Sequence, residues 1–412
     1  MDPPADAGEY GQMAIEYLSE LPKTADMVIV GGGIAGAATA FHASRAGIRP
    51  LILERRPALA TLTTAAAAGG FRLQLDNEEE YRLIRESVEL FLSFEEATGQ
   101  RDYDPDVRRH GYLWLTKGEE RAAVQRELVE AQRSWGLSDV EILDAGAVRE
   151  AFPWVSSDVV QARFRQDDGL LDPRRASLGL AAGSGAKVAT GCAATGFRLD
   201  PGGGRLAGVE TANGFVATRT AVIAAGPFSS VVAGWAGLDL PLTIVQRQKV
   251  VLPDVPEVPG EAPMTIDEDT GAHWRPAFRG AFLLFTDPST PPSNPAEDLR
   301  LDHSFAFKLL QPDSPQAVAR MTPFWRRVWE KGVAHWMLQA GQYDITPDRR
   351  PLLGELPVEG LFVNAGYSGH GIMGGPAGSR VLIDVVTGEL APEENPFTPD
   401  RAFVARPRLD AL

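Results

Sequence analysis

The sequence contains a single cysteine, Cys192, among its 412 residues, which excludes an internal disulfide framework and indicates a reducing compartment. One cysteine also cannot form a metal cluster, and we expect no metal site. Positive charge is in deficit: 40 Lys and Arg against 55 Asp and Glu give a net charge of −15. This balance argues against a nucleic-acid partner, because binding phosphates requires a basic surface.

Long apolar runs are also missing. No stretch approaches the roughly 20 apolar residues needed to span a bilayer. The first residues, MDPPADAGEY, carry acids where a secretory signal would carry lysine or arginine, so we expect a cytoplasmic protein. With 44% hydrophobic residues the chain can build a large core, and its length predicts two domains in one compact unit. Residues 1–23 are expected to be an N-terminal extension, with a short helix over 13–21.

A glycine turn early in the chain organises the rest. Residues 27–30, MVIV, predict a short buried strand, and an Ala-rich helix follows from Ile34 through Ala46. Between them Gly31, Gly33 and Gly36 have the GxGxxG spacing. In this arrangement the first glycine permits a tight turn, the second lets the backbone approach a pyrophosphate, and the third lets the helix pack on the strand. Free N–H groups at the helix N-terminus then face the phosphates.

The glycine turn is followed by a second apolar strand, residues 50–53, that ends at Glu54. An acid about 20 residues after the middle glycine can accept hydrogen bonds from a ribose diol. Because strand, turn, helix, strand and acid occur in this order, the segment predicts a dinucleotide site rather than a structural Gly-rich turn.

The remaining pattern predicts a nucleotide-binding sheet and a second, more antiparallel sheet. Residues 61–74, TLTTAAAAGGFRLQ, could let the backbone approach a flat ligand closely or could simply start a helix. We expect a strand over 216–226, a hairpin tip at 202–204, and alternating strands within 241–288. Further strands are expected at 111–116, 187–189 and 360–365, a surface loop at 288–297, and helices at 78–98, 119–135, 173–185, 315–321, 324–331 and 376–387.

Four motifs together resemble the D-amino-acid oxidase superfamily of FAD-dependent oxidoreductases, most nearly its glycine oxidase, sarcosine oxidase and sarcosine-oxidase-β branch. They are VGGGIAGAATA with LILE, DGLLDP with AKVATGC, VIAAGPFSS, and YDITPDRRPLLG with NAGYSGHGIMGGPA. They occur in family order from residue 27 to residue 387, and they are specific for the superfamily rather than for a substrate.

The resemblance implies an α/β fold: a doubly wound, glutathione-reductase-like Rossmann domain that binds FAD, and a mixed or antiparallel substrate domain. The FAD-binding domain would comprise 24–108, 158–238 and 338–395, and the substrate domain 109–157 and 239–337. Residues 343–375 lack cysteine and residues 54–74 lack histidine, the residues that tether flavin in some relatives, so non-covalent FAD is expected. Cys192 is expected to be a core residue without a redox role.

Residue by residue, the resemblance assigns the pyrophosphate to the glycine turn, the adenosine end to the acid and its neighbour, and the flavin to two later segments. Backbone N–H groups of the last segment would face the flavin N1 and C2 carbonyl, where negative charge develops on reduction. The residues implied are Gly31, Gly33, Ile34, Ala35 and Gly36; Glu54 and Arg55; Ala67, Ala68, Gly69 and Gly70; Val188; Ala225 and Gly226; and Gly369, His370, Gly371, Ile372 and Met373.

Candidate substrate residues are mostly cationic or aromatic. Arg72 aligns with a carboxylate-binding arginine of sarcosine oxidases, although a surface ion pair with Asp76 or Glu79 is the alternative. Arg275, and less so Arg247, are further anchors. His370 either acts near the flavin or only shapes its loop. Tyr343 and Tyr367 could donate a hydroxyl or simply pack, His273 and Trp274 could line the pocket, and Lys249 or Lys308 could replace a lysine that sarcosine oxidases carry after GHGF.

The resemblance implies an FAD-dependent enzyme that oxidises a C–N bond of an amino acid or a secondary or N-methyl amine to an imine by hydride transfer to flavin N5. Two alternatives stay open. One is a 2-hydroxy-acid dehydrogenase that uses an acceptor other than oxygen, and the other is the flavin subunit of a hetero-oligomeric oxidase. The expected partners are a small carboxylate substrate, dioxygen or an electron carrier, and possible homo- or hetero-oligomers.

Overall fold

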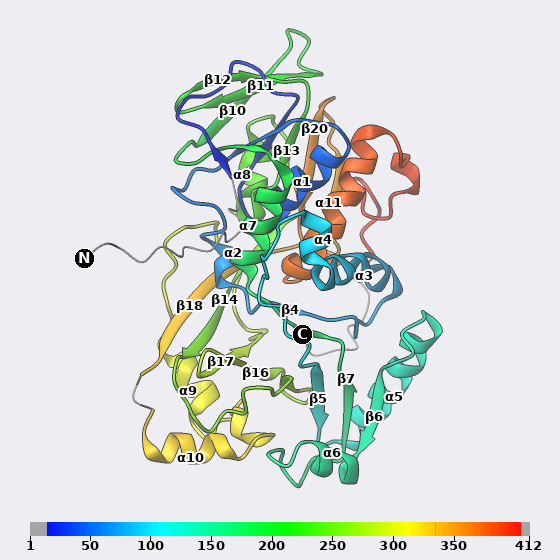
Figure 1. Cartoon of the computed structure of the whole chain (residues 1–412), viewed down its shortest axis with the longest axis vertical. Coiled ribbons are helices and arrows are strands. Elements are labelled where there is room, and N and C mark those ends of the chain that lie inside the picture. Colours follow the sequence, from blue (N-terminus) through cyan, green and yellow to red (C-terminus); the bar gives the residue numbers. More distant parts are fainter. Residues whose placement is uncertain (1–14, 334, 405–412) are drawn as a thin grey trace, which may run out of the picture.

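The computed structural model describes residues 15–333 and 335–404. Its strands form a seven-stranded and an eight-stranded sheet together with two small sheets. Figure 1 shows the seven-stranded sheet and most helices in the upper half, and the eight-stranded sheet below. The long strands β14 and β18 rise from the lower half toward the upper one. The predicted α/β fold with a second domain is therefore confirmed.

The seven-stranded sheet is parallel except at one edge, where β19 pairs antiparallel with β20. Its central strands are entirely buried, because both faces of the sheet are covered: helices pack on one face, and a small antiparallel sheet within residues 194–217 packs with a short helix on the other. The order is β1 (Glu16–Tyr17), β9 (Lys187–Ala189), β3 (Pro50–Leu53), β2 (Met27–Val30), β13 (Ala221–Ile223), β20 (Leu361–Ala365) and β19 (Leu352–Glu355).

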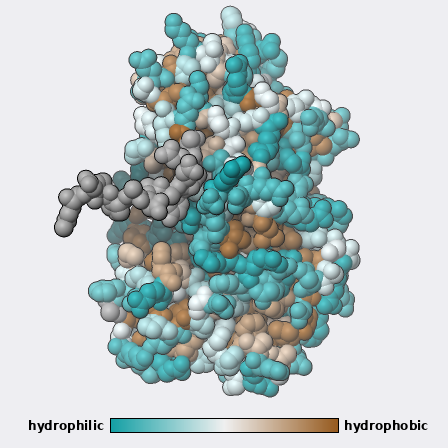
Figure 2. Space-filling model, viewed as in Figure 1, coloured by the Kyte–Doolittle hydropathy of each residue, from teal (hydrophilic) through white to brown (hydrophobic). Residues whose placement is uncertain are grey.

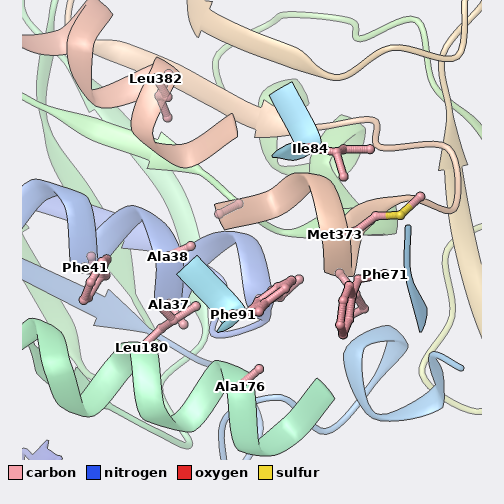
Figure 3. Packing of buried hydrophobic residues seen from close by; sticks show 14 of the residues in the cluster. Ala37, Ala38, Phe41, Phe71, Ile84, Phe91, Ala176, Leu180, Met373 and Leu382 are labelled. Carbon is pink, nitrogen blue, oxygen red and sulfur yellow. The ribbon is translucent and has the colours of Figure 1, made fainter. Parts of the chain in front are cut away.

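Small residues on α1 (Ile34–Arg45) allow two long helices to pack closely against it. They are α7 (Pro173–Ser184) and α11 (Gly371–Thr387), and α11 also contacts α3 (Glu78–Leu92). Figure 3 shows Ala37, Ala38 and Phe41 of α1 among Leu180, Leu382 and Phe91. Burying one large apolar side chain contributes about 1.5–3 kcal/mol, so this cluster is a main source of stability for the upper half.

The eight-stranded sheet is mostly antiparallel, with one parallel pair between β15 and β5. Trp274, Trp325 and Phe324 form an aromatic core between the sheet and the helices below it. The strand order is β18 (Met337–Ile345), β14 (Thr243–Leu252), β17 (Gly280–Phe285), β16 (Ala272–Ala277), β15 (Met264–Asp267), β5 (Tyr112–Thr116), β7 (Gln161–Arg165) and β6 (Glu141–Asp144).

Shorter elements complete the fold. The small sheets are β10 (Ala194–Leu199), β11 (Leu206–Thr211) and β12 (Gly214–Ala217), and the pair β4 (Gly70–Phe71) with β8 (Gly169–Leu170). The other helices are α2 (Thr63–Ala66), α4 (Phe94–Thr98), α5 (Glu119–Ser134), α6 (Ala145–Ala151), α8 (Ser229–Gly234), α9 (Ser304–Leu310) and α10 (Phe324–Lys331), with 3₁₀ turns at Gly226–Phe228, Val318–Arg320 and Pro392–Glu394.

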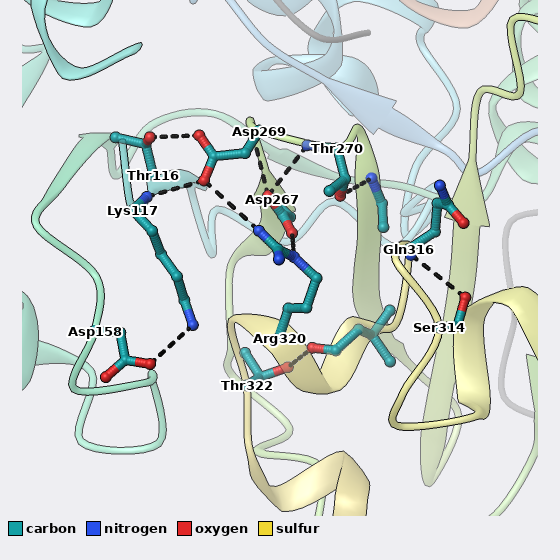
Figure 4. Close-up of polar contacts among 12 residues, drawn as sticks. Thr116, Lys117, Asp158, Asp267, Asp269, Thr270, Ser314, Gln316, Arg320 and Thr322 are labelled. Atoms are coloured by element: carbon teal, nitrogen blue, oxygen red, sulfur yellow. Dashed lines mark hydrogen bonds and ion pairs between the residues drawn. The ribbon is translucent and has the colours of Figure 1, made fainter. Parts of the chain in front are cut away.

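Charged residues join the loops at the far end of the eight-stranded sheet. Arg320 donates to Asp267 over 2.9 Å, and Asp269 accepts from Thr116 Oγ1 over 2.6 Å (Figure 4). The Asp267 side chain is 3% exposed, and burial raises the pKa of its carboxyl although Arg320 opposes the shift. This network lies among loops of the lower sheet and fixes their conformation.

Several predicted elements are wrong. The helix expected over 13–21 is not formed within the described residues: Glu16–Tyr17 is strand β1, because its backbone pairs with β9. The single strand expected over 216–226 is two strands, β12 and β13, separated at Thr218, whose hydroxyl hydrogen-bonds Asp26 O and Thr220 O. Strand β18 and helix α9 were not predicted, and the helix expected over 315–321 is only a 3₁₀ turn.

The last helix begins at Gly371, five residues before the predicted start at Pro376. Proline cannot donate a backbone hydrogen bond, so sequence reasoning placed it at the first turn. Tertiary packing overrides this preference: a Cβ at Gly378 would lie 2.2 Å from Tyr367 Oη, and Ser87 Oγ accepts the N–H of Ala377 over 3.0 Å.

Strand pairing bears on the expected domain limits. β7 and β18 belong to the eight-stranded sheet, whereas limits at 158 and 338 would assign both to the FAD-binding domain. We therefore propose limits after Arg165 and after Ile345, with the large cavity between the two parts.

The face seen in Figure 2 is mainly hydrophilic, with smaller apolar areas between the charged residues. Among the residues that the structure describes, no helix combines the length and the apolar character required to cross a bilayer.

Candidate functional site

A cavity of about 560 Å³ extends along the ends of the central parallel strands and reaches the eight-stranded sheet. Its size lies within the usual range of about 300–1,000 Å³ for small-molecule sites. Six segments supply most of its wall: residues 30–35, 53–56, 60–70, 224–228, 339–345 and 364–373.

The glycine turn is formed as predicted, and the structure shows why each of these three positions is a glycine. Gly31 has a φ of +116°, and a Cβ there would lie 2.4 Å from Ala224 O. A Cβ at Gly36 would lie 1.9 Å from Gly31 O, so only glycine lets α1 start this close to β2. At Gly33 the nearest atom is Thr64 Oγ1 at 3.1 Å, and the residue lines the cavity, where its missing side chain leaves room for a ligand.

Glu54, at the end of β3, accepts hydrogen bonds from Gly32 N and Arg56 N, each over 2.8 Å. The next two residues hold a segment from the other half of the molecule. Arg55 Nε lies 2.8 Å and Arg56 Nη1 lies 2.6 Å from the carboxylate of Glu297. The Arg55 guanidinium also lies 3.8 Å from the centre of the Phe228 ring. The segment around Glu297 is thereby fastened to the expected nucleotide end.

The late loop runs from β20 into α11. Gly369 has a φ of +104°, and a Cβ there would lie 2.7 Å from the Tyr343 ring, which explains the glycine spacing of this segment. Gly371, Ile372 and Met373 are the first turn of α11 rather than loop, and first-turn N–H groups have no partner within a helix. These N–H groups are therefore available at the cavity wall.

Asp344 on β18 lines the cavity and anchors the late loop. Its Oδ2 accepts the N–H of Gly366 over 2.7 Å, and its backbone oxygen accepts the N–H of Ser368 over 3.1 Å. Burial raises the pKa of the Asp344 carboxyl to about 6. The carboxyl therefore loses its proton within a pH range in which the folded protein can be measured.

Replacing Asp344 with asparagine tests this pKa. Because the folded pKa lies above the ordinary value of 3.8, the stabilising contribution of the group is complete below about pH 4 and is lost as the pH rises through about 6. Asparagine does not titrate. The free energy of unfolding of the variant minus that of the unmodified chain should therefore increase by roughly 1.5 kcal/mol from pH 5 to pH 7.5. Urea unfolding of flavin-free protein measures the difference. A difference that does not change with pH contradicts the prediction, and Asp313→Asn at an exposed position is the control.

Arg72, just after β4, lies at the substrate-domain end of the cavity and is 2% exposed, so it is not a surface residue. Its Nη1 donates to Gln74 O, and its guanidinium carbon lies 5.0 Å from the centre of a Trp114 ring. The cavity wall around it also includes Tyr112, Met264 and His273. Burial lowers the pKa of His273 to about 4, so His273 is neutral near pH 7.

Arg275 and Lys249 lie behind this wall and are not among the residues that line the cavity. Arg275 Nη1 donates to Pro276 O over 3.0 Å, and its guanidinium lies 4.5 Å from the Phe282 ring centre. Lys249 Nζ donates to Ala67 O over 2.8 Å. Burial lowers the pKa of Arg275 to about 10 and that of Lys249 to about 7. Arg247, in contrast, lines the cavity beside Tyr343.

The structure brings most of the predicted site residues to one cavity. Gly36, Val188 and Arg275 do not line it: Gly36 faces the turn, Val188 is a buried residue of β9 whose backbone oxygen accepts from Leu18 N, and Arg275 is behind the wall. Trp274 does not line it either and packs in the aromatic core of the lower sheet, and the candidate lysines Lys249 and Lys308 are also absent from the wall. Those that line it are Gly31, Gly33, Ile34, Ala35, Glu54, Arg55, Arg72, Ala67, Ala68, Gly69, Gly70, Ala225, Gly226, Tyr343, Gly369, His370, Gly371, Ile372 and Met373.

Comparison with known proteins decides the family. The FAD dependent oxidoreductase family model (DAO) matches residues 26–385. The chain belongs to this family. Mouse mitochondrial sarcosine dehydrogenase is 27% identical over 393 residues, which cover 92% of this chain but only 41% of that protein. The β subunit of sarcosine oxidase from an Arthrobacter species is 26% identical, with 93% of this chain and 92% of the subunit covered.

The fold of this FAD-dependent oxidoreductase also matches solved structures. L-proline dehydrogenase from P. horikoshii superposes with a TM-score of 0.78 at 23% identity, over 90% of this chain and 95% of that one. At this identity the similarity supports the fold. This chain spans about two fifths of the length of mouse sarcosine dehydrogenase, so the activity of that whole protein is not carried over.

The cofactor of this oxidoreductase is FAD, and the cavity fits it. The place where a Cβ is missing at Gly33 suits the pyrophosphate, Glu54 and Arg55 lie at the next strand end, and the first turn of α11 lines the cavity close to the start of α1. Helix N-termini stabilise negative charge, so α1 and α11 suit phosphate and flavin respectively.

Acid precipitation tests whether the flavin is non-covalent. We expect all flavin absorbance to remain in the supernatant after the oxidoreductase is precipitated with trichloroacetic acid, because no cysteine or histidine stands at the tethering positions of the sequence. The measurement is the ratio of flavin absorbance in supernatant and redissolved pellet. Flavin that stays with the pellet contradicts the prediction.

Sequence reasoning missed other residues of the site. Tyr112 and Met264 come from neighbouring strands of the eight-stranded sheet, and Glu297 comes from a loop that was expected only to cover the surface. No local signal identifies them, because sheet order brings them to the cavity. Glu80, which contacts His370, had a signal: Asn77 with Glu80 three residues later is a helix-capping pattern.

Proposed function

We propose that this oxidoreductase removes hydride from the carbon next to the nitrogen of an amino acid or of a secondary or N-methyl amino acid, giving an imine. The observation that carries the proposal is Arg72, a buried guanidinium that lines the same cavity as the late loop. A planar guanidinium binds a carboxylate through two parallel hydrogen bonds, and it does so most strongly where water is excluded.

The names of the relatives support a secondary amine. Sarcosine and proline, the substrates in the names of the relatives described above, are both α-amino acids with a secondary nitrogen. An arginine anchor and an apolar pocket suit such small zwitterions. We therefore place secondary α-amino acids first among the candidate substrates.

The residues of this chain bind and orient the substrate, whereas bound flavin supplies the hydride acceptor at N5. Arg72 would hold the carboxylate at the end of the cavity beside Tyr112 and Met264. Tyr343 lies against Gly369, and the Arg247 guanidinium carbon lies 6.0 Å from its ring centre. These contacts fix the Tyr343 ring in the cavity wall, where it shapes the substrate pocket.

Anaerobic addition of candidate substrates tests the function. The purified protein is mixed with sarcosine, L- and D-proline, dimethylglycine, glycine and 2-hydroxy acids, and flavin absorbance near 450 nm is followed. Bleaching by at least one amino acid supports the proposal. Bleaching only by 2-hydroxy acids, or by none of these compounds, overturns it.

A second candidate is the flavin subunit of a hetero-oligomer, favoured because this chain covers 92% of the β subunit of Arthrobacter sarcosine oxidase. Size-exclusion chromatography with activity measured on the isolated chain separates the possibilities. Turnover by the chain alone supports an independent enzyme, and flavin reduction without turnover supports a missing partner. Parallel assays with dioxygen and with an artificial acceptor distinguish an oxidase from a dehydrogenase.

A further inference from the structure

The carboxylate of Glu80, in the first turn of α3, is held in a fixed place. Glu80 N donates to Asn77 Oδ1 over 2.8 Å, and Asn77 Nδ2 donates to Glu80 Oε2 over 2.7 Å. This reciprocal cap joins the side chain to the helix N-terminus, where negative charge is favoured. The residue is 7% exposed. A buried carboxylate held in one position in this way indicates a specific partner for its other oxygen.

The second oxygen of Glu80 contacts a histidine of the late loop. Glu80 Oε1 lies 3.1 Å from His370 Nδ1, across 290 residues of sequence. Burial by itself would raise the pKa of Glu80, but the hydrogen bonds from His370 and Asn77, with the nearby charge of Arg72, lower it below the ordinary value. An ionised carboxylate only accepts hydrogen bonds, so Nδ1 of His370 carries a proton.

His370 lines the cavity immediately before the first turn of α11. With Nδ1 committed to Glu80, the other ring nitrogen, Nε2, is the one available to a ligand. In the neutral ring Nε2 has a lone pair and no proton. Glu80 therefore fixes the tautomer in which Nε2 is a proton acceptor. A carboxylate bonded to one ring nitrogen of a catalytic histidine has the same effect in other enzymes.

Arg72 belongs to the same arrangement. The charge of Arg72 is close enough to Glu80 to contribute to the lowering of its pKa, and Arg72 lines the same cavity. In an α-amino acid the carboxylate carbon and the nitrogen are both bonded to the same α-carbon. A carboxylate anchor and a proton acceptor arranged around one fixed carboxylate match that pair of groups.

The proposed reaction requires such an acceptor. An alkyl amine is protonated below about pH 10 and then has no lone pair to support loss of hydride from the neighbouring carbon. We propose that His370 Nε2 takes this proton from the substrate ammonium and that Glu80 positions His370 for the transfer, an inference that rests on the amine-oxidising function proposed above.

The proton transfer balances without a further reactant. The N–H bond of the ammonium breaks and an Nε2–H bond forms, so the amine becomes neutral and the ring becomes imidazolium. Glu80 stabilises this positive charge across the 3.1 Å contact. The lone pair returned to the nitrogen forms the C=N bond as hydride leaves, and the imidazolium releases its proton to water after the product departs.

Charged and polar groups on the surrounding elements include one rival proton acceptor. Arg350 forms an ion pair with Glu79 next to Glu80, Tyr343 packs under Gly369, and Asp344 holds the late loop from β18. Asp344 also lines the cavity and is the competing proton acceptor. An experiment must therefore separate His370 from Asp344.

Stopped-flow reduction of the holoenzyme by its best amine between pH 6 and pH 10.5 makes the separation. We expect His370→Gln to slow flavin reduction about 100-fold at pH 7 and the deficit to close to within about threefold at pH 10.5, where roughly half of the substrate amine is already neutral. Glu80→Gln should slow flavin reduction at pH 7 by less than His370→Gln does, and this deficit should also close at high pH. The double variant should match His370→Gln, because Glu80 acts through His370.

The control is Glu89→Gln on the same helix, an exposed residue paired with Arg85, which should reduce at the unmodified rate. Asp344→Asn should keep the pH profile of the unmodified enzyme. A deficit of His370→Gln that is constant across pH, or a profile abolished by Asp344→Asn instead, overturns the proposal.

A second readout needs no substrate. Long-range ¹H–¹⁵N NMR of histidine-labelled holoenzyme reports which ring nitrogen carries the proton, and His370→Gln identifies the signal. We expect the Nδ1–H form in the unmodified chain and a mixture or the Nε2–H form in Glu80→Gln. A neutral ring in the Nε2–H form in the unmodified chain overturns the inference. If the Nδ1–H form is found but no amine bleaches the flavin, the proposed function fails and the positioning stands.

Discussion

Gly36→Ala is expected to lower the free energy of unfolding by at least about 3 kcal/mol, and the variant should be purified with little FAD. The φ of Gly36 is helical, so backbone strain is not the reason. The added Cβ would lie 1.9 Å from Gly31 O, a backbone atom that cannot move without displacing the turn. Because that turn forms the cofactor wall, stability and FAD content should fall together.

Urea unfolding and the ratio of absorbance at 450 nm to that at 280 nm measure the two effects. Gly234→Ala on α8 is the matched control, because nothing lies within 4 Å of a Cβ there. Alanine replaces glycine in that helix without a clash and should leave stability unchanged or raise it by up to about 1 kcal/mol. If Gly36→Ala keeps both its stability and its full FAD content, the close packing of α1 on the turn is wrong.

The second large effect concerns Arg72. Replacing it with lysine should lower kcat/KM for a carboxylate-bearing amine about 100-fold or more, because an ammonium group cannot form two parallel hydrogen bonds to a carboxylate. The loss should be much smaller for an amine that has no carboxylate. Steady-state kinetics with such a matched pair of substrates measures the difference.

Arg275→Lys separates the two predicted anchors. Since Arg275 does not line the cavity, its replacement should change kcat/KM by less than about threefold. Equal losses in both variants, or an Arg72→Lys loss that is the same with and without the carboxylate, contradict the assignment of Arg72. Arg198→Lys, in an exposed ion pair on β10, controls for purification and folding.

Local features of the fold were predictable from sequence because their causes are local. The strand, glycine turn and helix around Gly31 and Gly36 occupy one continuous segment, residues 27–45, and the structure reproduces them. The helix over Pro173–Ser184 begins with Asp172 as its cap, as its sequence indicates. Such contacts can be inferred from a single chain.

Other features depend on tertiary contacts that no local pattern encodes. Glu80 meets His370 and Arg56 meets Glu297 across 290 and 241 residues respectively. Whether Arg247 or Arg275 faces the cavity follows from the order and pleat of the eight-stranded sheet, which composition does not specify. Helix α11 starts before Pro376 for the same reason, since packing against Tyr367 outweighs the local preference.

The visible spectrum of the purified chain tests the central claim most directly. The account predicts a yellow protein with flavin absorbance near 450 nm and about one FAD for each chain after saturation and desalting, held between the glycine turn and the first turn of α11. A folded protein that stays colourless after incubation with excess FAD would contradict it.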